Sequence, residues 1–167
     1  MSKNFYIKKM GKKAKLASSN LSSLSIEKRN AVLRKFSKYL KTNSQSILKS
    51  NKKDILNAQS KKIKESMIDR LKLDSIRISQ IRKSIEEIIK FKDPVGENLS
   101  SWKRPNGLII KKISIPIGVI GVIYESRPNV TADVSSLCFK SGNVVILRGG
   151  SEAFYSNKLI AKLFRQA

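Results

Sequence analysis

The sequence contains no histidine and a single cysteine, which excludes several kinds of site. One cysteine cannot form a disulfide within the chain, and zinc is bound mainly by cysteine and histidine, so no metal site is expected. Long apolar runs are also absent, and none approaches the ~20 residues needed to cross a bilayer. The first residues, MSKNFYIKKMGKKAK, are basic but lack the apolar segment of a secretory signal. These absences favour a reducing, cytoplasmic setting without a membrane partner.

Acidic residues are scarce, since 12 Asp and Glu stand against 35 Lys and Arg, giving a net charge of +23. The imbalance lies in residues 1–112, which hold 29 of the basic and 9 of the acidic residues. The basic residues are mostly lysines spread over expected helical faces, where such side chains normally lie in solvent. A solvated surface is therefore the preferred interpretation. A basic nucleic-acid-binding protein is the alternative, although no zinc-finger, helix-turn-helix or aromatic RNA-binding pattern supports it.

Apolar residues at helical spacing predict a series of helices before residue 91. Ser25 and Asp74 are good N-caps for two of them. Asp93-Pro94-Val95-Gly96 ends the series. The expected helices cover residues 4–20, a segment after Ser25 to about Lys41, a segment capped within 42–44 and kinked at Asn51, a short turn near Met67, and a long helix after Asp74 with the inner stripe Ile78, Ile81, Ile85, Ile88 and Ile89.

The pattern changes from helical to extended after residue 100. Residues 102–107 read as a turn-rich link, and 108–115 as a strand at a sheet edge, antiparallel to the next. Residues 117–124 and 144–147 are apolar enough for strands covered on both faces. Helices are expected from Pro128 to Gly142, with Val130, Val134, Leu137 and Cys138 inside, and over 152–165. The fold class is therefore α/β: a helical lead-in, residues 1–107, followed by a βαβα unit, residues 108–167.

Polar residues gather where both strands of this unit stop, which is the edge where open parallel sheets bind ligands. Arg148-Gly149-Gly150 offers backbone N–H groups and a permanent positive charge before a helix, which suits a phosphate. The alternative is a tight turn with a surface arginine, since neither common nucleotide-binding glycine motif is present. Glu125 and Arg127 follow a run too apolar for solvent, so they either pair with each other or face a ligand cleft.

Two residues with reactive side chains are interpreted as structural. Cys138 lies in the middle of a helix, and the chain has no histidine to activate it, so a buried thiol is expected. Asp133, one turn earlier, is expected to face solvent or to cap the helix. The sequence therefore offers no catalytic residue.

The runs YESRPNVT and SGNVVILRGG, with AKLASSNLSSLSIEKRNAVL and DPVG before them, resemble the N-terminal region of the gamma-glutamyl phosphate reductase family. This family, also called glutamate-5-semialdehyde dehydrogenases, belongs to the aldehyde dehydrogenase superfamily. The resemblance implies a helical lead-in followed by part of a Rossmann-like cofactor domain. It also implies that the chain is an N-terminal fragment whose catalytic domain, with the nucleophilic cysteine, is absent.

The activity implied by the resemblance is the NADPH-dependent reduction of L-glutamyl 5-phosphate to L-glutamate 5-semialdehyde, with release of phosphate, in proline biosynthesis. It further implies a cytoplasmic homo-oligomer for the full-length protein and a functional association with glutamate 5-kinase. The isolated chain is expected to be inactive and poorly soluble. A standalone nucleotide-binding remnant without catalysis is the alternative.

The resemblance also assigns site residues, position by position within the matching runs. Arg148 takes the place of the basic residue that contacts the adenosine ribose or its 2′-phosphate, which favours NADP. Arg127 stands where many aldehyde dehydrogenases have an oxyanion-stabilising asparagine, so Arg127 and Asn129 are instead assigned to the acyl-phosphate substrate. The implied cofactor-binding residues are Tyr124, Glu125, Ser126, Arg148, Gly149, Gly150, Ser151 and Glu152.

Overall fold

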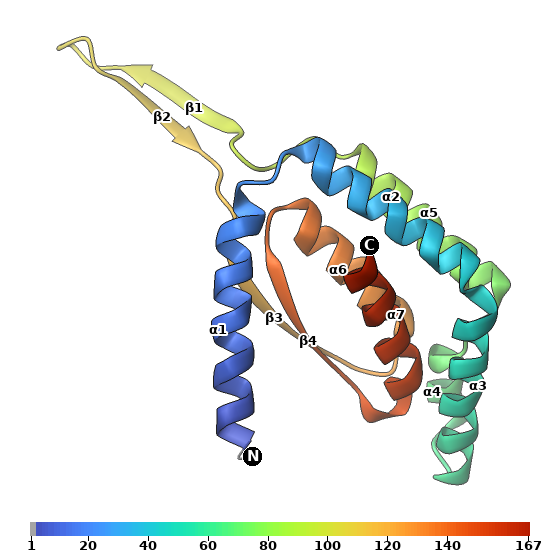
Figure 1. Ribbon diagram of the computed structural model, residues 1–167. Helices are drawn as coiled ribbons and strands as arrows, with labels where there is room; N and C mark the ends of the chain where they lie inside the picture. The colour runs from blue at the N-terminus through green and yellow to red at the C-terminus, as the bar shows by residue number, and fades with distance from the viewer. Residues whose placement is uncertain (1–2) are drawn as a thin grey trace.

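The computed structural model describes residues 3–167, and its first half is helical (Figure 1). Its helices are α1 (Lys3–Ser22), α2 (Ile26–Thr42), α3 (Ser44–Ser60), α4 (Glu65–Leu71) and α5 (Ser75–Lys90). The caps predicted at Ser25 and Asp74 are confirmed, because Ser25 accepts a hydrogen bond from the Lys28 N–H and Asp74 accepts one from the Arg77 N–H. The cap predicted within residues 42–44 is not, because Asn43 precedes α3 without a side-chain cap hydrogen bond. The kink expected at Asn51 is wrong: α3 is uninterrupted there, and the Asn51 side chain bonds to other segments instead of to its own helix.

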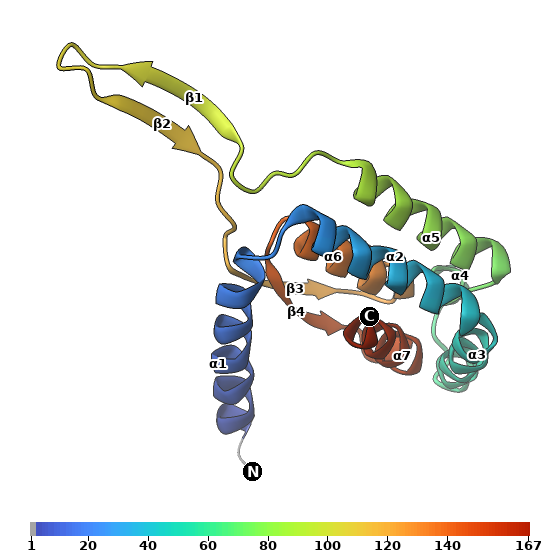
Figure 2. The same cartoon turned by 45° about the horizontal axis from the view of Figure 1, so that its top comes forward.

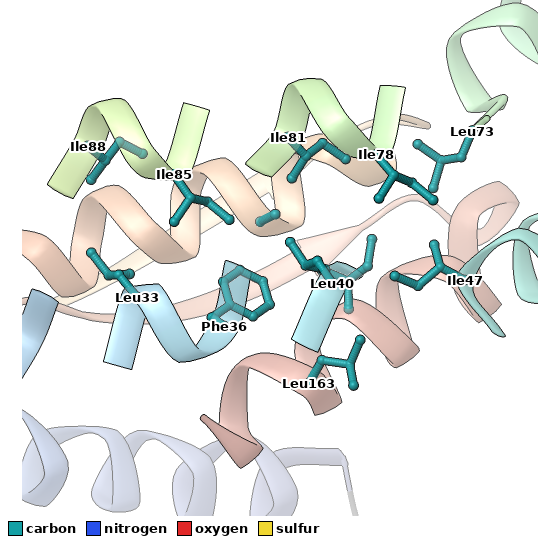
Figure 3. Packing of buried hydrophobic residues seen from close by; sticks show 12 residues of the cluster. Leu33, Phe36, Leu40, Ile47, Leu73, Ile78, Ile81, Ile85, Ile88 and Leu163 are labelled. Carbon is teal, nitrogen blue, oxygen red and sulfur yellow. The ribbon is translucent and has the colours of Figure 1, made fainter. Parts of the chain in front are cut away.

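The core forms where α2 lies beside α5, with α6 (Pro128–Lys140) and α7 (Phe154–Gln166) packed underneath (Figures 1 and 3). Leu33, Phe36 and Leu40 of α2 point towards the isoleucines of α5 (Figure 3). The predicted stripe on α5 is confirmed, since Ile78, Ile81, Ile85 and Ile88 are buried and Ile89 is partly buried. Burying these side chains is the main favourable contribution to folding, at about 1.5–3 kcal/mol each.

A two-stranded hairpin extends away from the helices (Figures 1 and 2). It consists of β1 (Asn98–Lys103) and β2 (Ile109–Ile113), which are antiparallel. Strand β2 was predicted, but its place at the edge of the parallel sheet was wrong, because it pairs only with β1 in a separate sheet. Strand β1 was missed, and residues 102–103 belong to it and not to a link. The segment NLSSWK shows no apolar alternation because all its residues are exposed.

The parallel sheet consists of β3 (Val119–Tyr124) and β4 (Val144–Gly149), joined through α6. This confirms the predicted strand–helix–strand unit, with Pro128 at the start of the helix. Helix α6 contacts β4, α5 and α7, and α1 contacts β4. A 3-10 turn, η1 (Ser151–Ala153), leads from β4 into α7. Both strands therefore end at the same edge, beside the start of α6 and of α7.

The inner face of α6 differs from the prediction. Leu137 is 46% exposed, and Val130 and Val134 are only partly buried. The buried face is made of small side chains instead: Thr131, Ala132, Ser135, Ser136 and Cys138. Small residues let the helix lie close to its neighbours, and the one large apolar side chain of α6 that packs against the core is that of Phe139, which is partly buried. The burial of Cys138 is as predicted, and burial raises the pKa of its thiol.

One face of the parallel sheet is open. Ile123, in β3, is 86% exposed, and Ile117, just before it, is 83% exposed. The expectation that this strand is covered on both faces is therefore wrong for this chain. Two strands and their helices leave this apolar surface in solvent. Among the helices described within residues 3–167, none has the length and apolar character to cross a membrane.

Candidate functional site at the edge of the parallel sheet

The ends of β3 and β4 bring together the two polar runs singled out in the sequence. The strand register pairs Tyr124 with Gly149, so the turn after β3 lies beside the loop after β4. The Ser126 hydroxyl donates a hydrogen bond to Glu152 Oε2 at 3.3 Å, and the Ser151 hydroxyl donates one to Oε1 at 3.0 Å. The backbone N–H of Glu152 and these hydroxyls hold the pKa of its carboxyl below the ordinary value. Glu152 is therefore an ionised acceptor that joins the two loops.

Gly149 lies against a chain of three polar side chains. The Tyr124 hydroxyl is 2.6 Å from Thr131 Oγ1, and the Thr131 hydroxyl donates to Asn157 Oδ1 at 2.9 Å. Burial raises the pKa of Tyr124, which remains a neutral donor here. Thr131 and Asn157 were not predicted as site residues. The sequence signal that could have found them is a polar residue on the inner face of a helix that directly follows a strand: Thr131 in α6 after β3, and Asn157 in α7 after β4.

A side chain at position 149 does not fit. A Cβ on Gly149 would lie 2.5 Å from Asn157 Nδ2 and 3.0 Å from the Tyr124 hydroxyl. A Cβ on Gly150 would lie 2.5 Å from Glu152 Oε2. Both glycines are therefore required by the close packing of the loop after β4 against Asn157, Tyr124 and Glu152.

Gly149→Ala is expected to destabilise the chain by about 1–3 kcal/mol, because Asn157 and Tyr124 have to move. Urea denaturation of the variant measures this. Gly121→Ala in β3 is the matched control, since nothing lies within 4 Å of its added methyl group. We expect the control to change the free energy of unfolding by no more than about 0.5 kcal/mol. Equal losses of unfolding free energy in the two variants would show that crowding at Gly149 does not destabilise the chain.

Arg148, Glu125 and Arg127 are exposed at this edge. The Arg148 guanidinium donates to the carbonyl of its neighbour Gly149, and its remaining donors point to no described residue. Of the two arrangements considered for Glu125 and Arg127, the ion pair is not observed among residues 3–167. Arg127 instead lines a separate cavity.

This cavity has a volume of about 320 Å³ and lies between the start of α6 and the α4–α5 segment. It contains both residues assigned to the substrate, Arg127 and Asn129. It also contains Asp133, so the expectation that Asp133 faces solvent or caps the helix is wrong. The Asn129 amide donates to Asp133 Oδ2 at 3.1 Å, whereas Asp133 Oδ1 is buried without a described partner. Burial raises the pKa of this carboxyl.

The structure thus groups the predicted residues into two neighbouring places. The residues assigned to a nucleotide lie at the sheet edge, and the two assigned to a substrate lie in the cavity at the start of α6. The residues of α4 and α5 that complete the cavity were missed. They lie more than 40 positions earlier in the chain, and the packing of α5 on α6 brings them there. Within residues 3–167 no cluster of three or more potential metal ligands occurs.

No protein-family model matches the chain. Curated proteins do: it is 54% identical over 154 residues to a gamma-glutamyl phosphate reductase from Caldicellulosiruptor saccharolyticus, which covers 92% of this chain and 37% of the relative. It is 46% identical over 164 residues to one from Clostridium tetani, covering 98% and 38%. The chain therefore spans about 37% of the length of the curated relatives it matches.

Solved structures agree. The crystal structure of gamma-glutamyl phosphate reductase from Thermotoga maritima matches with a TM-score of 0.91 and 42% identity, over 93% of this chain and 37% of that one. The Saccharomyces cerevisiae protein of the same name matches with a TM-score of 0.91 and 32% identity, over 95% and 40%. A Bacillus subtilis putative aldehyde dehydrogenase, at 21% identity and a TM-score of 0.64 over 90% and 31%, shares the fold alone. In both sequence and fold, the chain therefore matches the N-terminal part of gamma-glutamyl phosphate reductases.

Proposed function

We propose that this chain supplies the nucleotide-binding edge and part of the substrate cavity of an NADPH-dependent reductase. The enzyme converts L-glutamyl 5-phosphate to L-glutamate 5-semialdehyde with release of phosphate, a step of proline biosynthesis. The observation that carries the proposal is the meeting of two loops, 124–127 and 148–152, at one end of a parallel sheet. Ligands of open parallel sheets bind at that end.

The loop after β4 has the properties that a dinucleotide phosphate requires. Its two partly buried glycines carry no side chain, and Arg148 adds an exposed guanidinium. When bound, NADPH supplies the hydride for the reduction. Arg148 then binds the 2′-phosphate that distinguishes NADP from NAD, since a guanidinium forms paired, charge-assisted hydrogen bonds with phosphate. Glu152, ionised and held by two hydroxyls, is placed to accept hydrogen bonds from ribose.

The nucleophile does not come from this chain. Its one cysteine, Cys138, is buried in α6, and burial raises the pKa of the thiol, which disfavours the reactive thiolate. The chain also contains no histidine that would act as its base. We therefore propose that the thioester-forming cysteine belongs to another part of the enzyme. Residues 1–167 alone are expected to catalyse no turnover.

A chimera tests the proposal. In it, this chain replaces the aligned front part of the Thermotoga maritima protein, to which it is 42% identical. We expect the chimera to reduce NADP⁺ when glutamate 5-semialdehyde and phosphate are supplied, whereas residues 1–167 alone do not. A folded chimera without activity, with the parent protein active under the same conditions, would contradict the proposed function.

The role of Arg148 is tested in the same chimera. Arg148→Ala is expected to raise the KM for NADP⁺ about tenfold or more, because a charge-assisted contact is lost, and to leave the KM for NAD⁺ unchanged. Arg34→Ala, which removes an exposed arginine of α2, is the matched control and should change neither constant. A parallel loss with both nucleotides would show that Arg148 does not recognise the 2′-phosphate.

A further inference from the structure

The cavity at the start of α6 is rich in cationic groups that lack partners. Arg70 and Lys72, from the end of α4, and Arg127, before α6, line it. Their side-chain nitrogens have no hydrogen-bond or ion-pair partner among residues 3–167. The fourth cation, Arg77, is satisfied, since it bonds to the Asp69 carboxylate at 3.1 Å and to two backbone carbonyls. Three positive charges are thus free for anionic ligand groups.

The same cavity contains one acidic group in the opposite situation. The Oδ1 atom of Asp133 is buried, and no donor from the described part of the chain reaches it. Its other oxygen accepts only the Asn129 amide. A buried carboxylate oxygen without a donor is costly, so its retention calls for a ligand that donates. Asp69, the other acid of the cavity, is exposed and already paired with Arg77.

We propose that this cavity binds the amino-acid end of the substrate, with Asp133 as the residue that receives the α-ammonium group. This inference rests on the proposed function and extends it to substrate specificity. Arg70 and Lys72 bind the α-carboxylate, and Arg127, next to the end of β3, binds the phosphate. The free charges of the cavity then match those of a phosphorylated α-amino acid: cations for the carboxylate and phosphate, one anion for the ammonium. Its volume of about 320 Å³ lies at the small end of ligand sites.

The consequence is discrimination between an α-amino acid and the same chain without its amino group. A ligand lacking the ammonium leaves Asp133 Oδ1 unpaired and places carboxylates near a buried carboxylate. Sites built to bond a polar group reject analogues that lack it far more strongly than apolar sites reject a missing methylene. L-Glutamate and glutarate, which differ only by this amino group, are therefore the probes.

Binding is measured first on residues 1–167 by nuclear magnetic resonance. L-Glutamate is expected to shift the backbone amide signals around Asp133 in α6. Glutarate is expected to bind with an affinity at least about tenfold lower. Asp133→Asn should remove this difference. Asp69→Asn is the matched control, because it makes the same chemical change in the same cavity at an exposed, paired acid, and it should preserve the difference. Equal binding of both probes, no binding of either, or an unchanged preference in Asp133→Asn would overturn the proposal.

Kinetics in the chimera separate this inference from the proposed function. Asp133→Asn is expected to raise the KM for glutamate 5-semialdehyde about ten- to hundredfold, with the KM for NADP⁺ unchanged. The loss should be absent with glutarate semialdehyde, which has no amino group. An active chimera whose variant loses both aldehydes equally would overturn the Asp133 assignment alone. An inactive chimera in which residues 1–167 still prefer L-glutamate would overturn the proposed function and support the cavity assignment.

Discussion

Replacing Arg29 with methionine is expected to lower the free energy of unfolding by about 3–5 kcal/mol, which is the usual cost of removing one partner of a buried ion pair. Arg29 is 2% exposed. Its guanidinium bonds to Asp93 Oδ2 at 2.6 Å, to the Lys140 carbonyl, and through Nε to the Leu24 carbonyl at 3.2 Å. It therefore joins α2 to the end of α5 and the end of α6. Methionine keeps most of the volume and removes all three bonds.

A second buried cation, Lys140, lies close to this ion pair. The Lys140 ammonium, also buried, donates to Asn30 Oδ1 and to the Ile89 carbonyl, each at 2.8 Å. Burial lowers the pKa of Lys140, and the Asp93 charge counteracts this effect. Without Arg29, the Asp93 carboxylate has only the Val95 N–H as a described donor. Urea denaturation followed by circular dichroism measures the change.

Arg34→Met is the matched control on the same helix, because Arg34 is exposed. It should change the free energy of unfolding by less than about 0.5 kcal/mol. Arg29→Lys should fall between the two, since an ammonium keeps the charge but lacks the fork that reaches three acceptors. A loss below about 1 kcal/mol in Arg29→Met would show that the packing of α2 on α5, and not this ion pair, holds the three helix ends together.

Local signals explain why most elements could be predicted. Ser25 and Asp74 are N-caps whose oxygens accept bonds from N–H groups three residues on, and the α5 stripe repeats with the helical period. Strands β3 and β4 are apolar runs bounded by turn residues. Strand β1 gives no such signal, because none of its side chains is buried. It is held in place by its backbone pairing with β2. An element without a buried face has no period to detect.

The candidate site also has one part that local sequence signals could predict and one part that they could not. The sheet edge could be predicted, because parallel strands joined by a helix end on one side by geometry. The role proposed for Asp133 could not, because the face of α6 that it occupies becomes a cavity only through the residues of α4 and α5 that line its other side. The buried polar residues were missed for the same reason. Arg29 and Asp93 are 64 positions apart, and Asp54 and Ser156 are 102 apart.

Asp54→Ala is expected to cost about 3 kcal/mol of folding free energy and to loosen the loop after β4. Asp54, in α3, is 1% exposed. Its Oδ1 accepts from the Tyr155 N–H at 2.9 Å, and its Oδ2 accepts from the Ser156 N–H at 2.8 Å and from the Ser156 hydroxyl at 2.6 Å. Helix α7 has no side-chain cap of its own, so Asp54 supplies one from a distant part of the chain. Alanine leaves the two buried Ser156 donors and the partly buried Tyr155 N–H unpaired.

The network around this cap is continuous. Asn51, one turn earlier in α3, donates to Ser156 Oγ at 3.2 Å and to the Leu71 carbonyl at 2.8 Å, and accepts from the Leu73 N–H at 2.7 Å. Helix α3 therefore fixes both the start of α7 and the segment between α4 and α5. The first of these lies directly after the loop assigned to the cofactor, and the second includes Lys72, one of the cations of the cavity.

Asp74→Ala is the matched control for Asp54→Ala. Asp74 is an exposed cap that accepts one bond from Arg77 N–H, so its loss should cost about 1 kcal/mol. The functional consequence is measured by hydrogen exchange at the amides of residues 150–156. Exchange there should quicken in Asp54→Ala beyond the change in global stability and remain in proportion to it in Asp74→Ala. If both variants exchange in proportion to their stability, the loop after β4 owes its order to the sheet edge and not to the buried carboxylate of α3.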